Sequence, residues 1–125
     1  MNLISMPKIK HPVGTIIKGK MRHRAAVLDY FGNDPVAVMI TSSNETKYPD
    51  NLLMQSNHFE AGHPFGWRGD DKPSYMVRRR FIKIREWGEF RKVGKLTSEG
   101  LSFVKRKTKD QHPMYWRDYL PDPRT

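Results

Sequence analysis

The sequence predicts a mainly β protein, a small β-barrel with one helix near its C-terminal end. Several short segments are rich in Val, Ile and aromatic residues, turn-forming residues separate them, and one amphipathic segment ends in basic residues. A chain of 125 residues is long enough for one hydrophobic core. We expect a barrel domain over residues 13–107, a flexible leader over residues 1–12 and an aromatic tail over residues 108–125.

The strongest strand signal is a hairpin around Gly32-Asn33, a recognised two-residue turn. The flanking segments, residues 25–31 and 35–40, are apolar on both faces, which is typical of central strands in a covered sheet. If Phe31 faces Asp34, a regular register places Arg24 directly opposite Thr41.

The other elements follow from local patterns. Strands are expected over residues 13–18, 51–55, 74–87 and 90–96, with a bulge near residues 78–80 because three consecutive arginines interrupt the alternation. Residues 42–50 and 57–73 are predicted loops. Residues 97–107 form the predicted helix: Thr97 or Ser98 caps it, and Leu101 and Val104 form its apolar stripe.

The tail contains apolar residues at a density that is unusual for a disordered segment: Met114, Tyr115, Trp116, Tyr119 and Leu120. We expect it to pack within a dimer, on the barrel of its own chain, or in place of part of a partner's contact. Of these, packing within the dimer is the favoured expectation.

The composition limits the class of protein. Cysteine is absent, which excludes disulfides and thiolate metal sites, and the His spacing predicts no metal and no cofactor. No run of about 18 apolar residues is present and residues 1–12 lack a signal-peptide pattern, so a cytoplasmic protein without a membrane span is expected.

The net charge of +10 favours a polyanionic partner. Residues 72–107 carry 12 Lys and Arg against three acidic residues, which indicates a binding face.

Two constellations are candidate sites. Arg24 and Thr41, with Ser42 beside them, can bind a phosphate through a guanidinium fork and hydroxyl groups; the alternative is a structural cross-strand pair. His23, next to Arg24, is a candidate proton carrier or an ordinary exposed His.

The second constellation predicts a single-stranded nucleic acid track, with the alternatives of a solvated basic face or a docking surface for an acidic protein. Its cations are Arg78, Arg79, Arg80, Lys83, Arg85, Arg91, Lys92 and Lys95, and its interleaved aromatic residues are Tyr75, Phe81, Trp87 and Phe90.

The order of several motifs resembles the MazF/PemK (CcdB-like) toxins of bacterial toxin–antitoxin systems. These motifs are Gly14-Thr15-Ile16-Ile17, His23-Arg24-Ala25-Ala26-Val27-Leu28, Val38-Met39-Ile40-Thr41-Ser42, Tyr48-Pro49, the strand over residues 77–84, and Val93-Gly94-Lys95-Leu96-Thr97 followed by Glu99 and Leu101. The resemblance implies an SH3-like, CcdB/MazF-like β-barrel that forms a homodimer. It also implies a metal-independent endoribonuclease that cleaves single-stranded RNA through a 2′,3′-cyclic phosphate, and a cognate antitoxin.

The family's catalytic Arg and Thr fall on Arg24 and Thr41 of this sequence. The chain departs from the family pattern at Ala25, where the family has Pro, in the short connection before Arg24, and near Arg79, where some members carry an acidic base. Two alternatives remain: a non-catalytic RNA-binding barrel, and a CcdB-like topoisomerase (gyrase) poison. The last residues, Asp122-Pro123-Arg124-Thr125, differ from the Trp-Gly-Ile type ending of such poisons.

Overall fold

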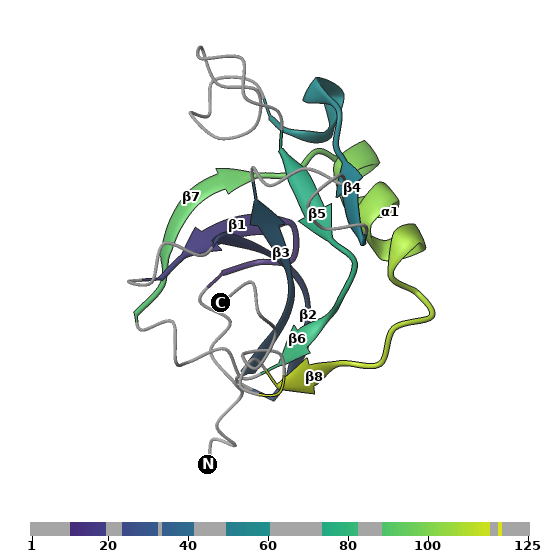
Figure 1. Ribbon diagram of the computed structural model, residues 1–125. Coiled ribbons are helices and arrows are strands. Elements are labelled where there is room, and N and C mark those ends of the chain that lie inside the picture. Colours follow the sequence, from purple (N-terminus) through teal and green to yellow (C-terminus); the bar gives the residue numbers. More distant parts are fainter. Residues whose placement is uncertain are drawn as a thin grey trace, which may run out of the picture.

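The protein folds as a curled, mainly antiparallel sheet with one α-helix packed beside it (Figure 1). The computed structural model describes residues 11–19, 24–32, 34–41, 50–60, 74–82, 89–115 and 118. Within this part of the chain the fold is mainly β with a single α-helix, as the sequence predicts. No helix among the described residues is long and apolar enough to cross a bilayer.

Apart from η1 and β8, which the sequence does not predict, the elements follow the predicted order along the chain. They are β1 (Thr15–Lys18), β2 (Arg24–Phe31), β3 (Asp34–Thr41), β4 (Asn51–Leu53), the short 3-10 helix η1 (Ser56–His58), β5 (Tyr75–Val77), β6 (Phe81–Ile82), β7 (Arg91–Lys95), α1 (Ser98–Lys107) and β8 (Met114–Tyr115). In space the strands lie in the order β4-β5-β3-β2-β1-β7, while β6 pairs with β3 on one side and β8 on the other.

Contacts between the two ends of this strand order make the sheet barrel-like. After η1 the chain returns to the end of β7, where Phe59 forms an isolated antiparallel bridge with Leu96. The N–H of Glu60 donates to the carbonyl of Lys95 (3.0 Å), and the N–H of Leu96 donates to the carbonyl of Gly14 (2.8 Å). The bridge and the first of these bonds join the segment that follows β4 to β7 at the opposite end of the sheet, and the second extends the pairing of β7 with β1.

Both faces of the central hairpin are covered, as its apolar sequence predicts. On one face, residues of the sheet pack with Val104 of α1: Ile16, Ala26, Leu28, Val38, Ile40, Met54, Phe59, Met76 and Leu96. On the other face lies a second, smaller core of Ile17, Ala25, Val27, Ala37, Val77 and Phe81. The hairpin therefore crosses the middle of the molecule, between two apolar layers.

The predicted register of the hairpin is correct near the turn and wrong beyond it. Phe31 faces Asp34 as predicted, but the register shifts by one residue between Asp29 and Val27. Leu28 is the extra residue of this β-bulge, and from there Arg24 faces Ile40 instead of Thr41. Because neighbouring residues of a strand point to opposite faces, this shift also reverses which residues of β3 share a face with Arg24.

The predicted strand over residues 74–87 contains a break. It forms β5 and β6, which are separated at residues 78–80, where the N–H of Arg79 donates to the carbonyl of Val77 (2.7 Å) in a tight turn. This is the position at which the sequence predicts an irregularity. Residues 83–88 lie outside the described part of the chain.

Helix α1 has the predicted cap and apolar stripe. The Thr97 hydroxyl accepts a hydrogen bond from the N–H of Gly100 (3.1 Å), and Val104 is fully buried with Leu101 packed against the same core. Gly100 has a second role that the sequence does not reveal. A Cβ at this position would overlap the carbonyl group of His58, so the absence of a side chain lets η1 approach the helix.

The tail contacts the barrel of its own chain, at β6. The β8 strand pairs in parallel with β6, with Met114 opposite Phe81 and Tyr115 opposite Ile82, and Met114 packs on the second core. Docking on the chain's own barrel was one of the expected arrangements, but not the favoured one, which was packing within a dimer. Trp116, Tyr119 and Leu120 lie outside the described residues.

Candidate nucleic-acid interface

Three basic residues lie side by side where β2, β1 and β7 run next to one another. Lys18 is the cross-strand partner of Arg24 on β2 and of Arg91 on β7. Directly opposed residues of antiparallel strands have Cβ atoms about 4.5–5.5 Å apart and point to the same face. We call Lys18, Arg24 and Arg91 the cation row.

The cation row adjoins the first core. Ile16 and Ala26, which are paired and buried, lie two residues from Lys18 and Arg24 on the same face of the sheet. Arg24 and Lys18 are half-buried and Arg91 is exposed, so the row runs from the edge of the core into solvent. Three positive charges at adjacent positions of one sheet face suit an anion that contacts several cations at once.

The structure does not place Arg24 opposite Thr41. Arg24 shares a face with its partner Ile40, whereas Thr41 follows Ile40 along β3 and therefore points to the other face. Thr41 instead lies opposite the buried Tyr75 of β5. The two residues belong to different sides of the sheet because the bulge at Leu28 inserts one residue between the turn and Arg24.

The three consecutive arginines, which we call the arginine clasp (Arg78, Arg79 and Arg80), contact other parts of the same chain. Arg78 donates to Asp110 (2.6 Å) and to the carbonyl of Lys107 (3.1 Å). Arg79 donates to Asp50 (2.7 Å). Arg80 donates to the buried Thr108 hydroxyl (3.0 Å) and to the carbonyl of Lys105 (3.4 Å). Arg78 and Arg80 therefore tie the break between β5 and β6 to the C-terminal end of α1, where exposed carbonyl groups favour positive charge, and Arg79 ties it to the residue before β4.

The carboxylate of Asp110 is held in its charged form by these contacts. Partial desolvation acts to raise its pKa, but the hydrogen bond from its own backbone N–H and the charge of Arg78 outweigh this effect and lower the pKa. Arg78 thus has a charged partner within the chain.

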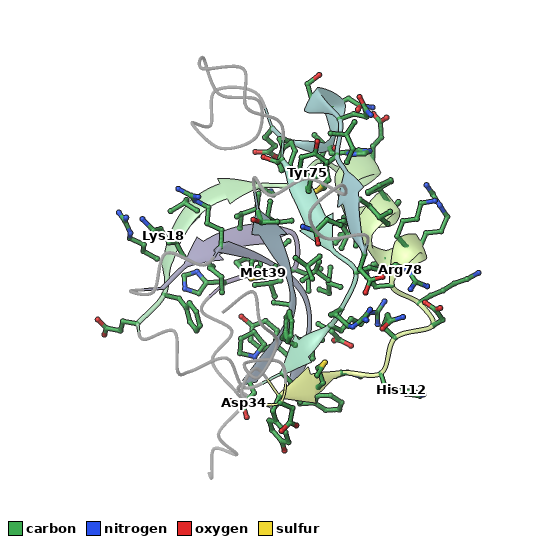
Figure 2. All side chains as sticks on the ribbon, viewed as in Figure 1. Lys18, Asp34, Met39, Tyr75, Arg78 and His112 are labelled. Atoms are coloured by element: carbon green, nitrogen blue, oxygen red, sulfur yellow. The ribbon has the colours of Figure 1, made fainter. Side chains whose placement is uncertain are left out.

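The described basic residues of the stretch 72–107 lie on two sides of the molecule. Figure 2 shows Lys18, which pairs with Arg91, and Arg78 on opposite sides of the molecule. Among the described residues the predicted basic track is therefore divided between these two sides, and its role in RNA binding stays a prediction. The two basic surfaces are the cation row and the surface around the clasp and the end of α1.

The described aromatic residues of the predicted track are also not free to stack on bases. Phe81 is completely buried and Tyr75 is 8% exposed, and Phe90 packs against the second core. These aromatic rings stabilise the fold, and base stacking on Tyr75 or Phe81 is excluded by their burial. The alternation of cations and aromatic residues in this stretch reflects a strand with a buried face.

Several predicted site residues fall outside the described part of the chain. These are His23, Ser42, Lys83, Arg85 and Trp87. Their proposed roles stay predictions. Among the described residues, no cluster of three or more His, Asp or Glu side chains could hold a metal ion.

Lys18 is the site residue that the sequence argument missed. It ends a short strand whose neighbours are β2 and β7, and β7 lies more than 70 residues further along the chain. The pairing of Lys18 with Arg24 follows from the β1–β2 hairpin and could have been found by extending the register argument to that hairpin. The pairing with Arg91 depends on the strand order and has no local signal.

Fold and charge together define a small, basic, barrel-like β protein with one helix. No protein-family model matches the sequence, and no curated protein is significantly similar to it. The MazF/PemK resemblance is therefore a hypothesis that rests on the order of its motifs.

Proposed function

We propose that this protein binds single-stranded RNA and cleaves it as the metal-independent endoribonuclease of a toxin–antitoxin system. The cation row is the observation that carries this proposal. It gathers Lys18, Arg24 and Arg91 on one face of the sheet, and it includes the residue to which the family resemblance assigns catalysis. A phosphate of the RNA backbone fits this site because it carries one negative charge and several acceptor oxygens.

In the proposed reaction the RNA 2′-oxygen attacks the adjacent phosphorus. The new 2′-O–P bond forms as the P–O5′ bond breaks, and the products are a 2′,3′-cyclic phosphate and a 5′-hydroxyl. The proton leaves the 2′-hydroxyl and another is supplied to the departing 5′-oxygen. Arg24 would stabilise the additional negative charge on the phosphoryl oxygens, because donors that are already in place need no reorganisation. His23 remains the candidate proton carrier.

The same proposal includes a cognate antitoxin, a homodimer and a cytoplasmic location. A basic binding surface of this kind would need to be blocked when the toxin is inactive, and an acidic partner could do so by charge complementarity. The proposal does not require Thr41, which points to the other face of β3.

The position of Thr41 favours one alternative, a barrel that binds RNA without cleaving it. If catalysis requires a guanidinium and a hydroxyl at one phosphate, the separation of Arg24 and Thr41 leaves a binding surface alone. This alternative shares the cation row with the main proposal and differs only in the reaction.

Incubation of the purified protein with labelled single-stranded RNA in the presence of EDTA tests the proposal. We expect cleavage products with a cyclic phosphate, strongly reduced cleavage by Arg24→Ala, and unchanged cleavage by Asp29→Asn, which changes an exposed charge on β2 five residues from Arg24. Binding without cleavage would establish the non-catalytic alternative. Equal rates for Arg24→Ala and the unsubstituted protein would exclude Arg24 as the catalytic residue.

A further inference from the structure

Two residues of the arginine clasp hold carboxylates on the protein surface. The Arg78–Asp110 pair has a separation of 2.6 Å and the Arg79–Asp50 pair one of 2.7 Å. The four side chains are between 33% and 59% exposed, so a dissolved polyanion can reach both pairs. Exposed pairs of this kind contribute about 0–1 kcal/mol each.

The surroundings of Asp110 are strongly basic. Lys105, Arg106, Lys107 and Lys109 are all exposed on the last turn of α1 and just after it. Arg78 reaches the same place, since its Nε donates to the carbonyl of Lys107 (3.1 Å). Asp110 therefore places one carboxylate on a surface that carries several positive charges. Such a surface would attract several phosphates.

The clasp also connects this surface to the docked tail. The carbonyl of Arg80 accepts a hydrogen bond from the N–H of Met114 (2.9 Å), and β8 then continues along β6. Asp110 lies four residues before Met114 in the sequence, so its pairing with Arg78 anchors the segment that leads into β8. The β8 strand is only two residues long, and Met114 is only half-buried. This short pairing depends on the anchor because it buries little apolar area of its own.

We propose that Asp110 and Asp50 are internal competitors for RNA at the arginine clasp. When single-stranded RNA binds, its phosphates replace the two carboxylates at Arg78 and Arg79, and the β8 segment loosens from β6. The inference rests on the proposed binding of RNA, but it concerns a surface other than the cation row and requires no cleavage.

The energetic balance favours this exchange at low salt. One phosphate strand carries several charges and can contact Arg78 together with exposed cations near it, whereas Asp110 supplies a single charge at a weak surface pair. Release of counterions from RNA adds to the driving force and makes it depend on salt. The tail would consequently be docked in the free protein and released in the complex.

A matched pair of substitutions, each removing one negative charge, tests the competition. Asp110→Asn removes the anion from Arg78 while retaining its size, and Asp29→Asn makes the same change of net charge at an exposed position on β2. The Asp29 carboxylate accepts a hydrogen bond from the adjacent N–H of Tyr30 (2.8 Å), whereas the carboxylates paired with Arg78 and Arg79 are those of Asp110 and Asp50. We expect Asp110→Asn to bind a short oligouridine about two- to fivefold more tightly than Asp29→Asn, the range set by one surface pair. Asp50→Asn should show the same direction of effect.

Amide hydrogen exchange at Met114 reports on the tail. In the free protein the hydrogen bond to Arg80 slows exchange of this amide. We expect its exchange to become faster when a non-cleavable oligouridine binds. Without RNA, we expect its exchange to be faster in the Asp110→Asn protein than in the Asp29→Asn protein.

The outcomes separate this inference from the proposed function. If the unsubstituted protein does not bind oligouridine, the proposed function fails. If it binds, but Asp110→Asn and Asp29→Asn bind equally, or Met114 exchange is unaffected by RNA, only the present inference is overturned. Equal release of Met114 by oligoglutamate of the same charge would also overturn it, because the clasp would then be a site for acidic peptides.

Discussion

Replacement of Gly100 by Ala tests the close contact between α1 and η1, because this contact reverses the expected sign of the change in stability. Judged as an isolated helix, Gly100→Ala should stabilise the protein by about 1 kcal/mol, because Gly is the weaker helix former. In the structure the added Cβ would overlap the carbonyl oxygen of His58. The added Cβ is fixed by the backbone of α1, and the carbonyl belongs to the backbone of η1. No side-chain rotation can therefore relieve the overlap, and η1 must move away from α1.

That movement weakens contacts that the structure identifies. The N–H of Thr97 donates to the carbonyl of His58 (3.0 Å), a bond worth about 1 kcal/mol. The His58 ring stacks on Phe103 with centroids 4.4 Å apart, which contributes about 0.5–1.5 kcal/mol. Together with strain of about 1 kcal/mol from overpacking, the losses of about 2.5–3.5 kcal/mol exceed the gain in helix propensity of about 1 kcal/mol. We therefore expect Gly100→Ala to lower the free energy of unfolding by about 2 kcal/mol.

Urea unfolding followed by circular dichroism measures the effect. With an m-value of about 2 kcal/mol/M, the midpoint should fall by about 1 M. Ser102→Ala is the control, because Ser102 is exposed on the same helix and Ala there should leave the midpoint unchanged or slightly higher. A Gly100→Ala protein that is as stable as the unsubstituted one, or more stable, would refute the proposed close approach of η1.

Three further predictions concern stability and binding. Burial outweighs the attraction of Glu99 and lowers the pKa of His58 below its usual 6.5. The unfolded chain therefore binds more protons than the folded one, and stability should fall as the pH drops below about 6.5. The substitution His58→Gln should remove part of this pH dependence, measured by urea titrations at several pH values. Thr97→Ala should cost about 1 kcal/mol, measured by the same method, because it removes the cap on the N–H of Gly100; no loss would mean that the cap is dispensable. Lys18→Gln and Arg91→Gln should each reduce the salt dependence of RNA binding by about 0.7 in log–log slope, and an unchanged slope would remove that residue from the interface.

Local features of the sequence predicted local features of the fold. Thr97 caps α1 as expected, since a cap depends on residues within one turn of the helix. β2 pairs with β3, which follows it in the chain, as expected, and Gly32 at the end of β2 has the positive φ (59°) that suits Gly. Such features need no information about distant parts of the chain, so single-sequence reasoning finds them.

The candidate site could be predicted only in part. Arg24 was found because it begins an apolar strand, and the sequence also pointed to the arginine run at residues 78–80. The pairing of Arg24 with Thr41 was wrong, because the bulge at Leu28 carries no signal in a segment of ordinary strand-forming residues. The prediction that Tyr75 and Phe81 stack on bases was wrong because their burial depends on which face of a broken strand meets the second core.

By itself, the sequence determined that this chain is a basic, mainly β protein with one capped helix near its C-terminal end, because charge, alternation and capping are properties of short segments. Only the tertiary structure decided which charges meet. Lys18 and Arg91 become neighbours through the order β2-β1-β7, and Arg78 meets Asp110 because the end of α1 returns to the break between β5 and β6. Contacts of this kind depend on strand order and on a one-residue register shift, which arise from packing of the whole sheet and not from any segment of it.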